Sequence, residues 1–521
     1  MIEEGLRVMT DYALVFKYPS QSMVPVGRGY IIGEALALRS HLLSRLGDFF
    51  NASSGSVPTI SPQGAERMVA EEKSLLTRKA MSPIHPNAAG IDVGSQTHYV
   101  AVEPDCTKNP VRSFGCYTPD LHEMATWLLE CGITTVAMES TGVYWVPVYQ
   151  VLCSRGLAVH LVDARQLKNV PGRKTDVVDS QWIQQLHHYG LLKGCYLPDA
   201  KIAPLRDYWR YRASLVECAS REILHLQKSM EQMNLHLHKV LSDITGVSGL
   251  RILRAIIAGE RNPVVLAAMR ERGVKTKEPE IVKALIGNYR PECLFILAQS
   301  LELYEIFQVK IRQCDEQIQA YLCTLTPKVE SKEGNVKQAK GRSPRKNQPH
   351  FDLSGALHKL TGVDLTAIEG IECLTAQTLI AECGYDLSAF PTEKHFASWL
   401  TLCPENRITG GKIKKRRTRK SQNRAASALR LAAQSLHHSQ SALGAFFRRI
   451  KIRVGTPKAI TATARKLACL VYRMLRYGMD YVDIGQKEYE QRYQQQQIKA
   501  LNRKATLLGF TIVSLETGEV S

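Results

Sequence analysis

Residues 88–104 read AAGIDVGSQTHYVAVEP, and this stretch decides the fold class. Its alternation of apolar and polar residues predicts two β-strands joined by a turn. Two further strands are predicted in TTVAMES (134–140) and LAVHLVDA (157–164), and the helical spacing of apolar residues predicts helices over 120–132 and 144–156. Because strands alternate with helices here, we expect an α/β domain with parallel strands.

The rest of the chain is predicted to be largely helical. Long amphipathic patterns predict an antiparallel hairpin of coiled-coil type, which either packs within the chain or contacts a second protomer or another partner. We expect six segments: a weakly structured N-terminal extension (1–84), the α/β domain (85–204), the helical hairpin (205–325), a basic flexible linker (326–353), an all-α C-terminal domain (354–485) and a charged tail with a last helix (486–521). Met68 and Met81 are alternative candidates for the start of the chain.

The chain is strongly basic. Its 521 residues include 68 Lys and Arg against 49 Asp and Glu, which gives a net charge of +19. Such an excess indicates a polyanionic partner, most often nucleic acid. The 13 cysteines form no CxxC pair, so zinc-type spacing is absent and we expect reduced thiols. Because no segment resembles a signal sequence or a membrane span, we expect a cytoplasmic protein.

Two aspartates, Asp176 and Asp179, follow the last predicted strand in GRKTDVVDSQWI (172–183). On a helix they lie on one face, where two carboxylates repel each other unless a cation binds them. A solvated helix N-terminus gives the same pattern and is the commoner explanation of a lone DxxD motif. Two more carboxylates belong to predicted strands. Asp92 lies among small residues that allow another molecule to approach closely, and Glu139 ends the third strand.

Together these four carboxylates predict a metal site. In a parallel sheet, ligands bind at the carboxyl ends of the strands, and acidic side chains that converge there need a cation. Oxygen ligands favour Mg²⁺ or Mn²⁺, and two such ions about 4 Å apart hold the attacking and leaving oxygens of a phosphodiester. In so basic a chain, this pattern favours nucleic-acid chemistry over surface salt bridges. Arg173 and Lys174 stand next to the aspartates and are expected to attract phosphate.

The predicted C-terminal domain has two features typical of nucleic-acid binding. Residues 365–384 suggest a helix-hairpin-helix motif, a pattern that ordinary helical corners share. Among residues 412–420, seven of nine are Lys or Arg, which favours contact with a DNA or RNA backbone over a solvated charged face. The expected contacts are Lys412, Lys414, Lys415, Arg416, Arg417, Arg419, Lys420 and Arg424. Thr409 directly precedes them at a Gly-Gly turn.

Three stretches carry a family resemblance. AGIDVGSQTHYVAV, VAMESTGVYWVPVYQVL and VDARQLKNVPGRKTDVVDSQWIQQLHHYGLL resemble the DEDD-class transposases of bacterial insertion sequences, which are bridge-RNA-guided recombinases related to the Piv invertases. The resemblance covers roughly residues 85–485. It implies a RuvC-like, RNase H-type domain with Asp92, Glu139, Asp176 and Asp179 as the metal-binding, catalytic set.

The resemblance also implies a reaction and partners. A noncoding bridge RNA pairs with donor and target DNA, and the protein cuts and exchanges strands in the bacterial nucleoid. In this family the active site is composite: the RuvC-like domain of one protomer meets the C-terminal domain of another. The implied assembly is a homodimer that forms a tetramer, with residues 205–325 as the candidate dimer and RNA contact.

Two positions depart from the family pattern. The family carries a nucleophilic serine, which forms a covalent phosphoserine intermediate, where this chain has Thr409. Threonine offers the same hydroxyl, but its β-methyl group stiffens the side chain and crowds the approach. Ser421 is a weaker substitute, because it lies beyond the basic run. Asp163 adds a fifth carboxylate where an uncharged residue is expected, and the sequence assigns it no role.

Three functions follow from these observations. The leading one is a DNA transposase and recombinase that uses the DEDD site and the hydroxyl of Thr409. The second is a RuvC-like nuclease of branched DNA that uses water and needs no covalent intermediate. The third is a transposase inactivated at Thr409 that only binds nucleic acid.

Overall fold

The computed structural model describes residues 82–140, 142–167, 176–329, 347–419 and 423–512. The chain divides into two compact units after Cys195, and each unit is described by itself. The expected N-terminal extension falls almost entirely outside the described residues, and so does most of the expected basic linker.

The N-terminal unit is built around a five-stranded sheet with the order β3-β2-β1-β4-β5. The strands are β1 (Ala88–Val93), β2 (Thr97–Ala101), β3 (Val111–Gly115), β4 (Thr135–Glu139) and β5 (Ala158–Val162). β4 and β5 continue β1 in parallel, as expected, but β1, β2 and β3 pair antiparallel. The sheet is therefore mixed. Short turns, such as the one that joins β1 to β2, connect only antiparallel neighbours, whereas parallel neighbours need a crossover.

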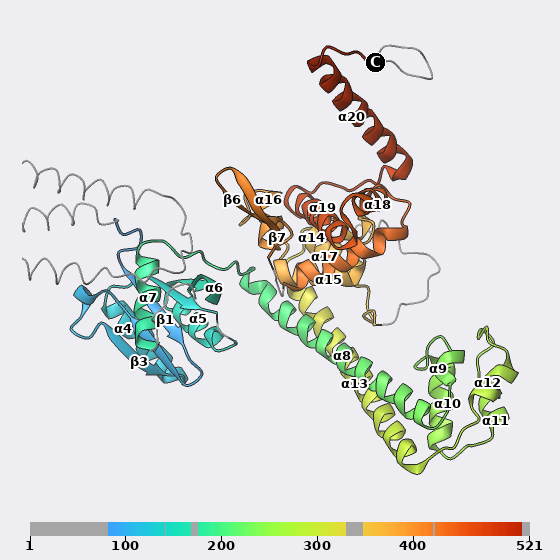
Figure 1. Cartoon of the computed structure of the whole chain (residues 1–521). Coiled ribbons are helices and arrows are strands. Elements are labelled where there is room, and N and C mark those ends of the chain that lie inside the picture. The colour runs from blue at the N-terminus through green and yellow to red at the C-terminus, as the bar shows by residue number, and fades with distance from the viewer. Residues whose placement is uncertain (1–81, 141, 168–175, 330–346, 420–422, 513–521) are drawn as a thin grey trace, which may run out of the picture. The chain divides into compact units, whose positions relative to one another are not determined.

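Helices complete this unit. They are η1 (Pro104–Cys106), α4 (Thr118–Glu130), α5 (Trp145–Ser154), α6 (Ala164–Leu167) and α7 (Asp176–His188). α4 and α5 are the helices predicted between strands, and α7 carries the paired aspartates. α7 packs across β1, β2 and β4, as Figure 1 shows. The apolar side chains of β1 and β4 that it helps to cover are fully buried, which fixes the register of these strands.

Gly90 allows α7 to lie this close to the sheet. A Cβ atom at this position would stand 2.2 Å from the backbone nitrogen of Gln184 and 2.4 Å from the backbone oxygen of Ser180. No side chain fits at such distances, so only glycine permits this contact between β1 and α7. The small residues around Asp92 were expected to admit another molecule. At Gly90 the closely approaching partner is a helix of the same unit.

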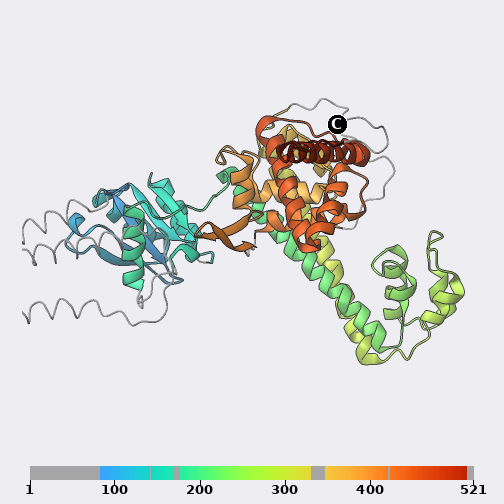
Figure 2. The same cartoon turned by 45° about the horizontal axis from the view of Figure 1, so that its top comes forward.

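The C-terminal unit begins with two long helices joined by shorter ones. α8 (Ala203–Gln232) follows the turn η2 (Ala200–Ile202) and packs along α13 (Pro291–Thr324) as the expected hairpin, side by side in Figures 1 and 2. Between them lie α9 (Leu237–Val240), α10 (Val247–Ile257), α11 (Pro263–Ala268) and α12 (Glu278–Ala284). Arg212 and Asp315 form an ion pair inside the hairpin, with the Arg212 Nε 2.5 Å from the Asp315 Oδ1. Both side chains are buried, so this pair fixes how the two helices face each other.

The remainder of the unit is helical except for one hairpin. Its elements are α14 (Leu353–Thr361), η3 (Leu365–Ala367), α15 (Cys373–Cys383), α16 (Glu393–Trp399), β6 (Pro404–Thr409), β7 (Lys412–Thr418), α17 (Arg424–Ser435), η4 (Leu436–His438), α18 (Ala442–Val454), α19 (Thr456–Tyr477) and α20 (Gly485–Leu507). Tyr472, Phe396 and Phe447 are the largest side chains fully buried in its core. α20 is the expected last helix, and none of its side chains is buried.

All thirteen cysteines are free, in agreement with the expected reduced thiols. Among the helices of the described segments, none is long and apolar enough to span a membrane.

Candidate active site and nucleic-acid interface

Asp92 and Glu139 stand at corresponding positions on neighbouring strands. β1 and β4 run parallel, and Ile91 is in register with Met138. One residue farther along, β1 carries Asp92 and β4 ends at Glu139. Both carboxylates are therefore at the carboxyl ends of adjacent parallel strands, where open α/β sheets bind their ligands.

Asp176 and Asp179 belong to α7, which packs against the strand that carries Asp92. Both belong to the first turn of the helix and are spaced by three residues, so they lie on one face. α7 packs against β1 through Gly90, two residues before Asp92. Arg173 and Lys174, the expected phosphate contacts beside this pair, fall outside the described residues.

The charges of the other three carboxylates all act on the pKa of Asp92. Burial contributes most to raising this pKa from 3.8 to about 6, followed in order by the negative charges of Asp176, Asp179 and Glu139. Such a shift means that the ionised form of Asp92 is destabilised where it stands. Carboxylates that oppose each other's ionisation are a frequent mark of a functional site.

The four side chains are not arranged as a closed metal site. Within the described ranges, no group of three or more His, Cys, Asp or Glu side chains is placed to hold a metal ion. Asp163 follows β5 and is half-buried, and the charges that shift the pKa of Asp92 do not include it.

Thr409 stands at the tip of the hairpin formed by β6 and β7, which is a two-stranded sheet of its own. It ends β6 and pairs with Lys412, the first residue of β7. Between them, Gly410 and Gly411 have φ angles of 56° and 72°. Positive φ at both central residues defines a type I′ turn, for which glycine is suited and which matches the twist of the strands. The turn holds Thr409 at an exposed position.

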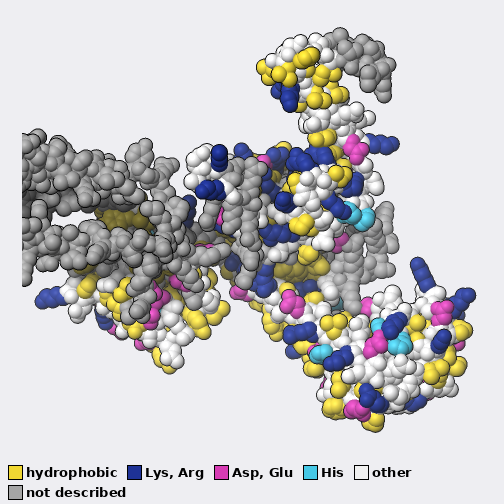
Figure 3. Space-filling view, viewed as in Figure 1, with side chains coloured by type: hydrophobic (Ala, Val, Ile, Leu, Met, Phe, Trp, Pro, Cys, Tyr) yellow, Lys and Arg dark blue, Asp and Glu magenta, His cyan; other side chains and the backbone are white. Residues whose placement is uncertain are grey.

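The basic run forms β7 and the segment after it. Lys412, Lys414, Lys415, Arg416 and Arg417 all belong to this strand, and Arg419 directly follows it. Lys412, Lys414, Arg419 and Arg424 are exposed, and Arg424 is the first residue of α17. Lys420 and Ser421 lie outside the described residues. Figure 3 shows further Lys and Arg side chains spread over the surface of the helical unit.

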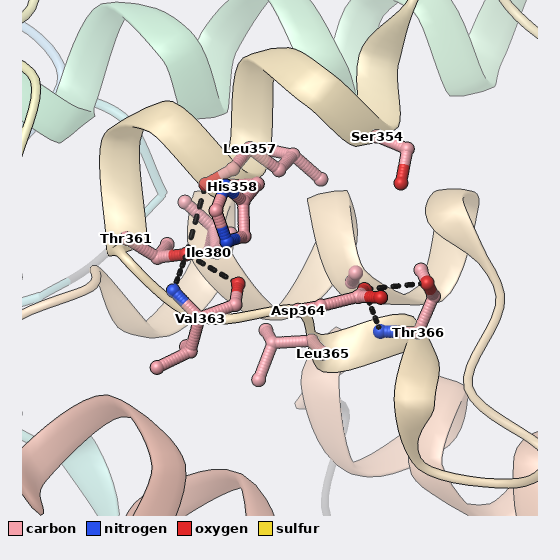
Figure 4. Close-up of a pocket in the computed structure, with 10 residues that line it drawn as sticks. Ser354, Leu357, His358, Thr361, Val363, Asp364, Leu365, Thr366 and Ile380 are labelled. Atoms are coloured by element: carbon pink, nitrogen blue, oxygen red, sulfur yellow. Dashed lines mark hydrogen bonds between the residues drawn. The ribbon is translucent and has the colours of Figure 1, made fainter. Parts of the chain in front are cut away.

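The expected helix-hairpin-helix differs from its prediction. Its first helix is a single 3₁₀ turn, Leu365–Ala367, followed by Gly370 at a φ of 89° and then α15. In Figure 4 the Asp364 carboxylate accepts hydrogen bonds from the backbone N–H and the hydroxyl of Thr366. The small pocket beside it has a volume of about 10 Å³, room for one water at most. Glu372 occupies the N-cap position of α15, and its negative charge disfavours a phosphate at that helix N-terminus.

Comparison with protein families gives two matches. Residues 89–235, which span the sheet and all of α8, match a family of transposases of the DEDD type defined for IS110 elements. Residues 364–448, which include Thr409 and the basic run, match the transposase family named for IS116, IS110 and IS902. The chain belongs to the IS110 family of transposases. A comparison with curated proteins found no match.

As an IS110-type transposase, the protein acts on the DNA of an insertion sequence, which it cuts and rejoins. Both matched regions contain candidate site residues: the first includes the four carboxylates and the second includes Thr409. Two arginines at the start of α8, Arg206 and Arg210, were not predicted as site residues, although they line a cavity described below.

Proposed function

We propose that this transposase is a bridge-RNA-guided, site-specific recombinase with a RuvC-like catalytic domain of RNase H type. The observation that carries its catalytic part is the placement of Asp92 and Glu139 at the ends of adjacent parallel strands, beside the helix that begins with Asp176 and Asp179. The strand order, with three antiparallel strands and then two parallel ones, supports the RNase H assignment, and so does the position of the acids on β1, at the end of β4 and on the helix that follows β5.

Asp92, Glu139, Asp176 and Asp179 are the proposed ligands of Mg²⁺ or Mn²⁺. The set offers only carboxylate oxygens, the donors that these hard ions prefer. A cation would also remove the repulsion that raises the pKa of Asp92. Because the described side chains form no closed site, binding requires them to reorient around the ion. When bound, the ion supplies charge stabilisation to a phosphodiester transition state.

Thr409 is the proposed nucleophile. Its oxygen bonds to the DNA phosphorus while the bond to the leaving strand oxygen breaks, and the hydroxyl proton is transferred in net to that oxygen. Rejoining reverses these steps, because a strand hydroxyl attacks the threonine phosphodiester and frees Thr409. The type I′ turn supports this role, since it presents the threonine at an exposed hairpin tip beside the basic strand β7.

Nucleic acid and further protomers are the proposed partners. Exposed basic residues at Lys412, Lys414, Arg419 and Arg424 support contact with donor DNA, target DNA or the bridge RNA. An exposed apolar surface of α13, within the segment expected to contact a second protomer, supports self-association into a dimer and then a tetramer. Its exposed side chains are Phe295, Ile296, Leu303, Ile306 and Val309.

A hydrolytic nuclease is the second candidate, because the four carboxylates alone suffice to activate water at a phosphodiester. A chain that binds nucleic acid without cutting it is the third, because threonine replaces the family's serine at position 409.

Glu139→Gln tests the metal assignment. The amide keeps the shape of the side chain but loses the charge that an ion requires. We expect cutting of element-end DNA with Mg²⁺ and the flanking RNA to fall by at least a hundredfold, while DNA binding in EDTA stays within twofold of wild type. Glu130→Gln, an exposed position at the end of α4, is the matched control and keeps full cutting. Normal cutting by Glu139→Gln would exclude the acidic site.

A further inference from the structure

A cavity of about 350 Å³ lies in the C-terminal unit, away from the residues assigned above except for Arg424. We call it the Arg206 pocket. Its lining comes from the chain just before α8, from α8 itself, from α15 and α16, and from the start of α17: Tyr196, Pro198, Arg206, Arg210, Glu382, Trp399, Asn423 and Arg424. This volume is within the range of about 300–1,000 Å³ that is typical of small-ligand sites.

One wall of the pocket is aromatic and apolar. Trp399 and Tyr196 meet edge to face, with ring centroids 5.2 Å apart, and both pack on Phe390 behind them. The Tyr196 hydroxyl donates a hydrogen bond of 2.8 Å to the backbone oxygen of Cys383, so its ring is fixed in place. The face of a ring held rigidly in such a cluster is suited to stacking on a nucleobase.

The rest of the pocket is positive. Three arginines face one glutamate, and Arg210 already neutralises that glutamate through hydrogen bonds of 2.8 and 2.6 Å to Glu382. Arg206 is held by its Nε, which donates to the backbone oxygen of Ala381 at 3.2 Å. Among the described residues, the terminal amino groups of Arg206 have no hydrogen-bond acceptor in the protein. Burial lowers the pKa of Arg206, and the negative charge of Glu382 only partly opposes this shift.

The start of α17 adds to the positive potential. Arg424 is the first residue of this twelve-residue helix and is exposed. Asn423 caps the helix, and its side chain accepts a hydrogen bond of 3.0 Å from the backbone N–H of Ala426. The helix dipole therefore supplements the two available arginines, Arg206 and Arg424, in attracting an anion.

We propose that the Arg206 pocket binds one unstacked nucleotide of a single-stranded nucleic acid, with its phosphate between Arg206 and Arg424 and its base against Trp399. A duplex keeps its base faces stacked and cannot use the aromatic wall, whereas a single strand presents both a base face and a phosphate. The inference rests on the proposed function, in which strand exchange and RNA pairing leave nucleotides unpaired. It adds a single-strand site to a protein otherwise expected to contact backbones.

Short homopolymers test the pocket on the full-length protein in EDTA, where nothing is cut. The probes are fluorescein-labelled tetranucleotides of deoxyuridine and uridine and a chain of four abasic deoxyribose phosphates, followed by fluorescence anisotropy. We expect wild type to bind the deoxyuridine probe about tenfold more tightly than the abasic chain. Trp399→Leu should lose this difference, whereas Arg424→Gln should weaken binding of both probes about tenfold.

Lys499→Gln is the matched control. It removes one charge at an exposed position on α20 and should change the affinity by less than twofold. Arg424 is exposed, so its variant folds even if the loss of Trp399 disturbs the aromatic cluster. Tighter binding of the uridine probe would assign the pocket to RNA, and tighter binding of the deoxyuridine probe would assign it to DNA. Equal binding of the two probes would mean that the pocket accepts either kind of strand. Each of these supports the proposal if the base preference depends on Trp399.

Two results would overturn it. Equal affinity of wild type for the base-containing and abasic chains would show that the pocket does not bind the base. If Arg424→Gln and Lys499→Gln weakened probe binding equally, the loss of affinity would reflect the net charge of the protein and not a contact in the pocket. Because this assay measures no cutting, it is independent of Glu139→Gln: normal cutting by that variant would refute the proposed function and leave the pocket result standing.

Discussion

After burial itself, the charge of Asp176 at the start of α7 contributes most to raising the pKa of Asp92 on β1 to about 6. These residues belong to elements that pack together because Gly90 has no side chain. The acidic site therefore depends on a backbone contact in the sheet as well as on its carboxylates. The first three predictions below follow from this relationship.

Asp92→Asn should stabilise the metal-free protein. The carboxyl ionises near 3.8 when unfolded but only near 6 when folded, so the folded state binds more protons between these values. The stability contributed by this group therefore falls as pH rises through that window and stays low above it. We expect the free energy of unfolding to rise by about 1–2 kcal/mol at pH 7.5 in urea titrations, with a smaller gain at pH 5.

Asp105→Asn, at an exposed site in the same unit, is the control and should change this free energy by less than about 0.5 kcal/mol. An Asp92→Asn protein less stable than wild type at pH 7.5 would show that the carboxylates do not repel each other. The variant should also lose cutting, since stability and function oppose each other at such sites.

Divalent ions should stabilise the protein in a pH-dependent way. A cation binds the ionised carboxylates, and below about pH 6 protons compete for Asp92. Saturating Mn²⁺ should raise the melting temperature at pH 7.5, and the rise should be much smaller at pH 5.5. Scanning calorimetry of wild type, Glu139→Gln and Glu130→Gln decides the matter. A full Mn²⁺ effect in Glu139→Gln would place the ion elsewhere.

Gly90→Ala should disturb the site without touching a carboxylate. Its Cβ would stand 2.2 Å from a backbone nitrogen of α7, so the helix that carries Asp176 and Asp179 must shift. We expect a loss of about 1–3 kcal/mol in the free energy of unfolding and a loss of cutting in the fraction that remains folded. At Gly273 an added Cβ meets nothing within 4 Å, so Gly273→Ala is the control with little effect. If Gly90→Ala cut DNA as well as wild type, the position of α7 would not matter for catalysis.

Much of the sheet could be predicted from the sequence because its inner strands are strongly apolar. β1, β2, β4 and β5 lie where alternation and apolar runs indicate them. β3 was not predicted. Its sequence VRSFG (111–115) is short, with two apolar residues, and it forms a strand because it pairs with β2 at the edge of the sheet. A strand with so few apolar residues owes its conformation to its neighbour, which local sequence does not report.

Some residues of the candidate sites could likewise be predicted from the sequence, and others could not. Asp92 and Glu139 could be assigned because each is tied to a predictable strand, and the DxxD spacing marks the start of α7. The Arg206 pocket could not be predicted, because its residues come from four helices and from the segment before α8. Side chains far apart in sequence meet there only through tertiary packing, and no periodicity or motif joins them.

A covalent protein–DNA adduct tests the central claim most directly, namely that the acidic site and the hydroxyl of Thr409 together cut DNA. Full-length protein is mixed with Mg²⁺, the RNA that flanks the element and a nicked suicide DNA, and then run on a denaturing gel. Wild type, Thr409→Ser and Thr409→Ala are compared. We predict an adduct in wild type and in the serine variant that is absent in the alanine variant. Cut DNA without an adduct in any lane would contradict the account and favour hydrolysis by water.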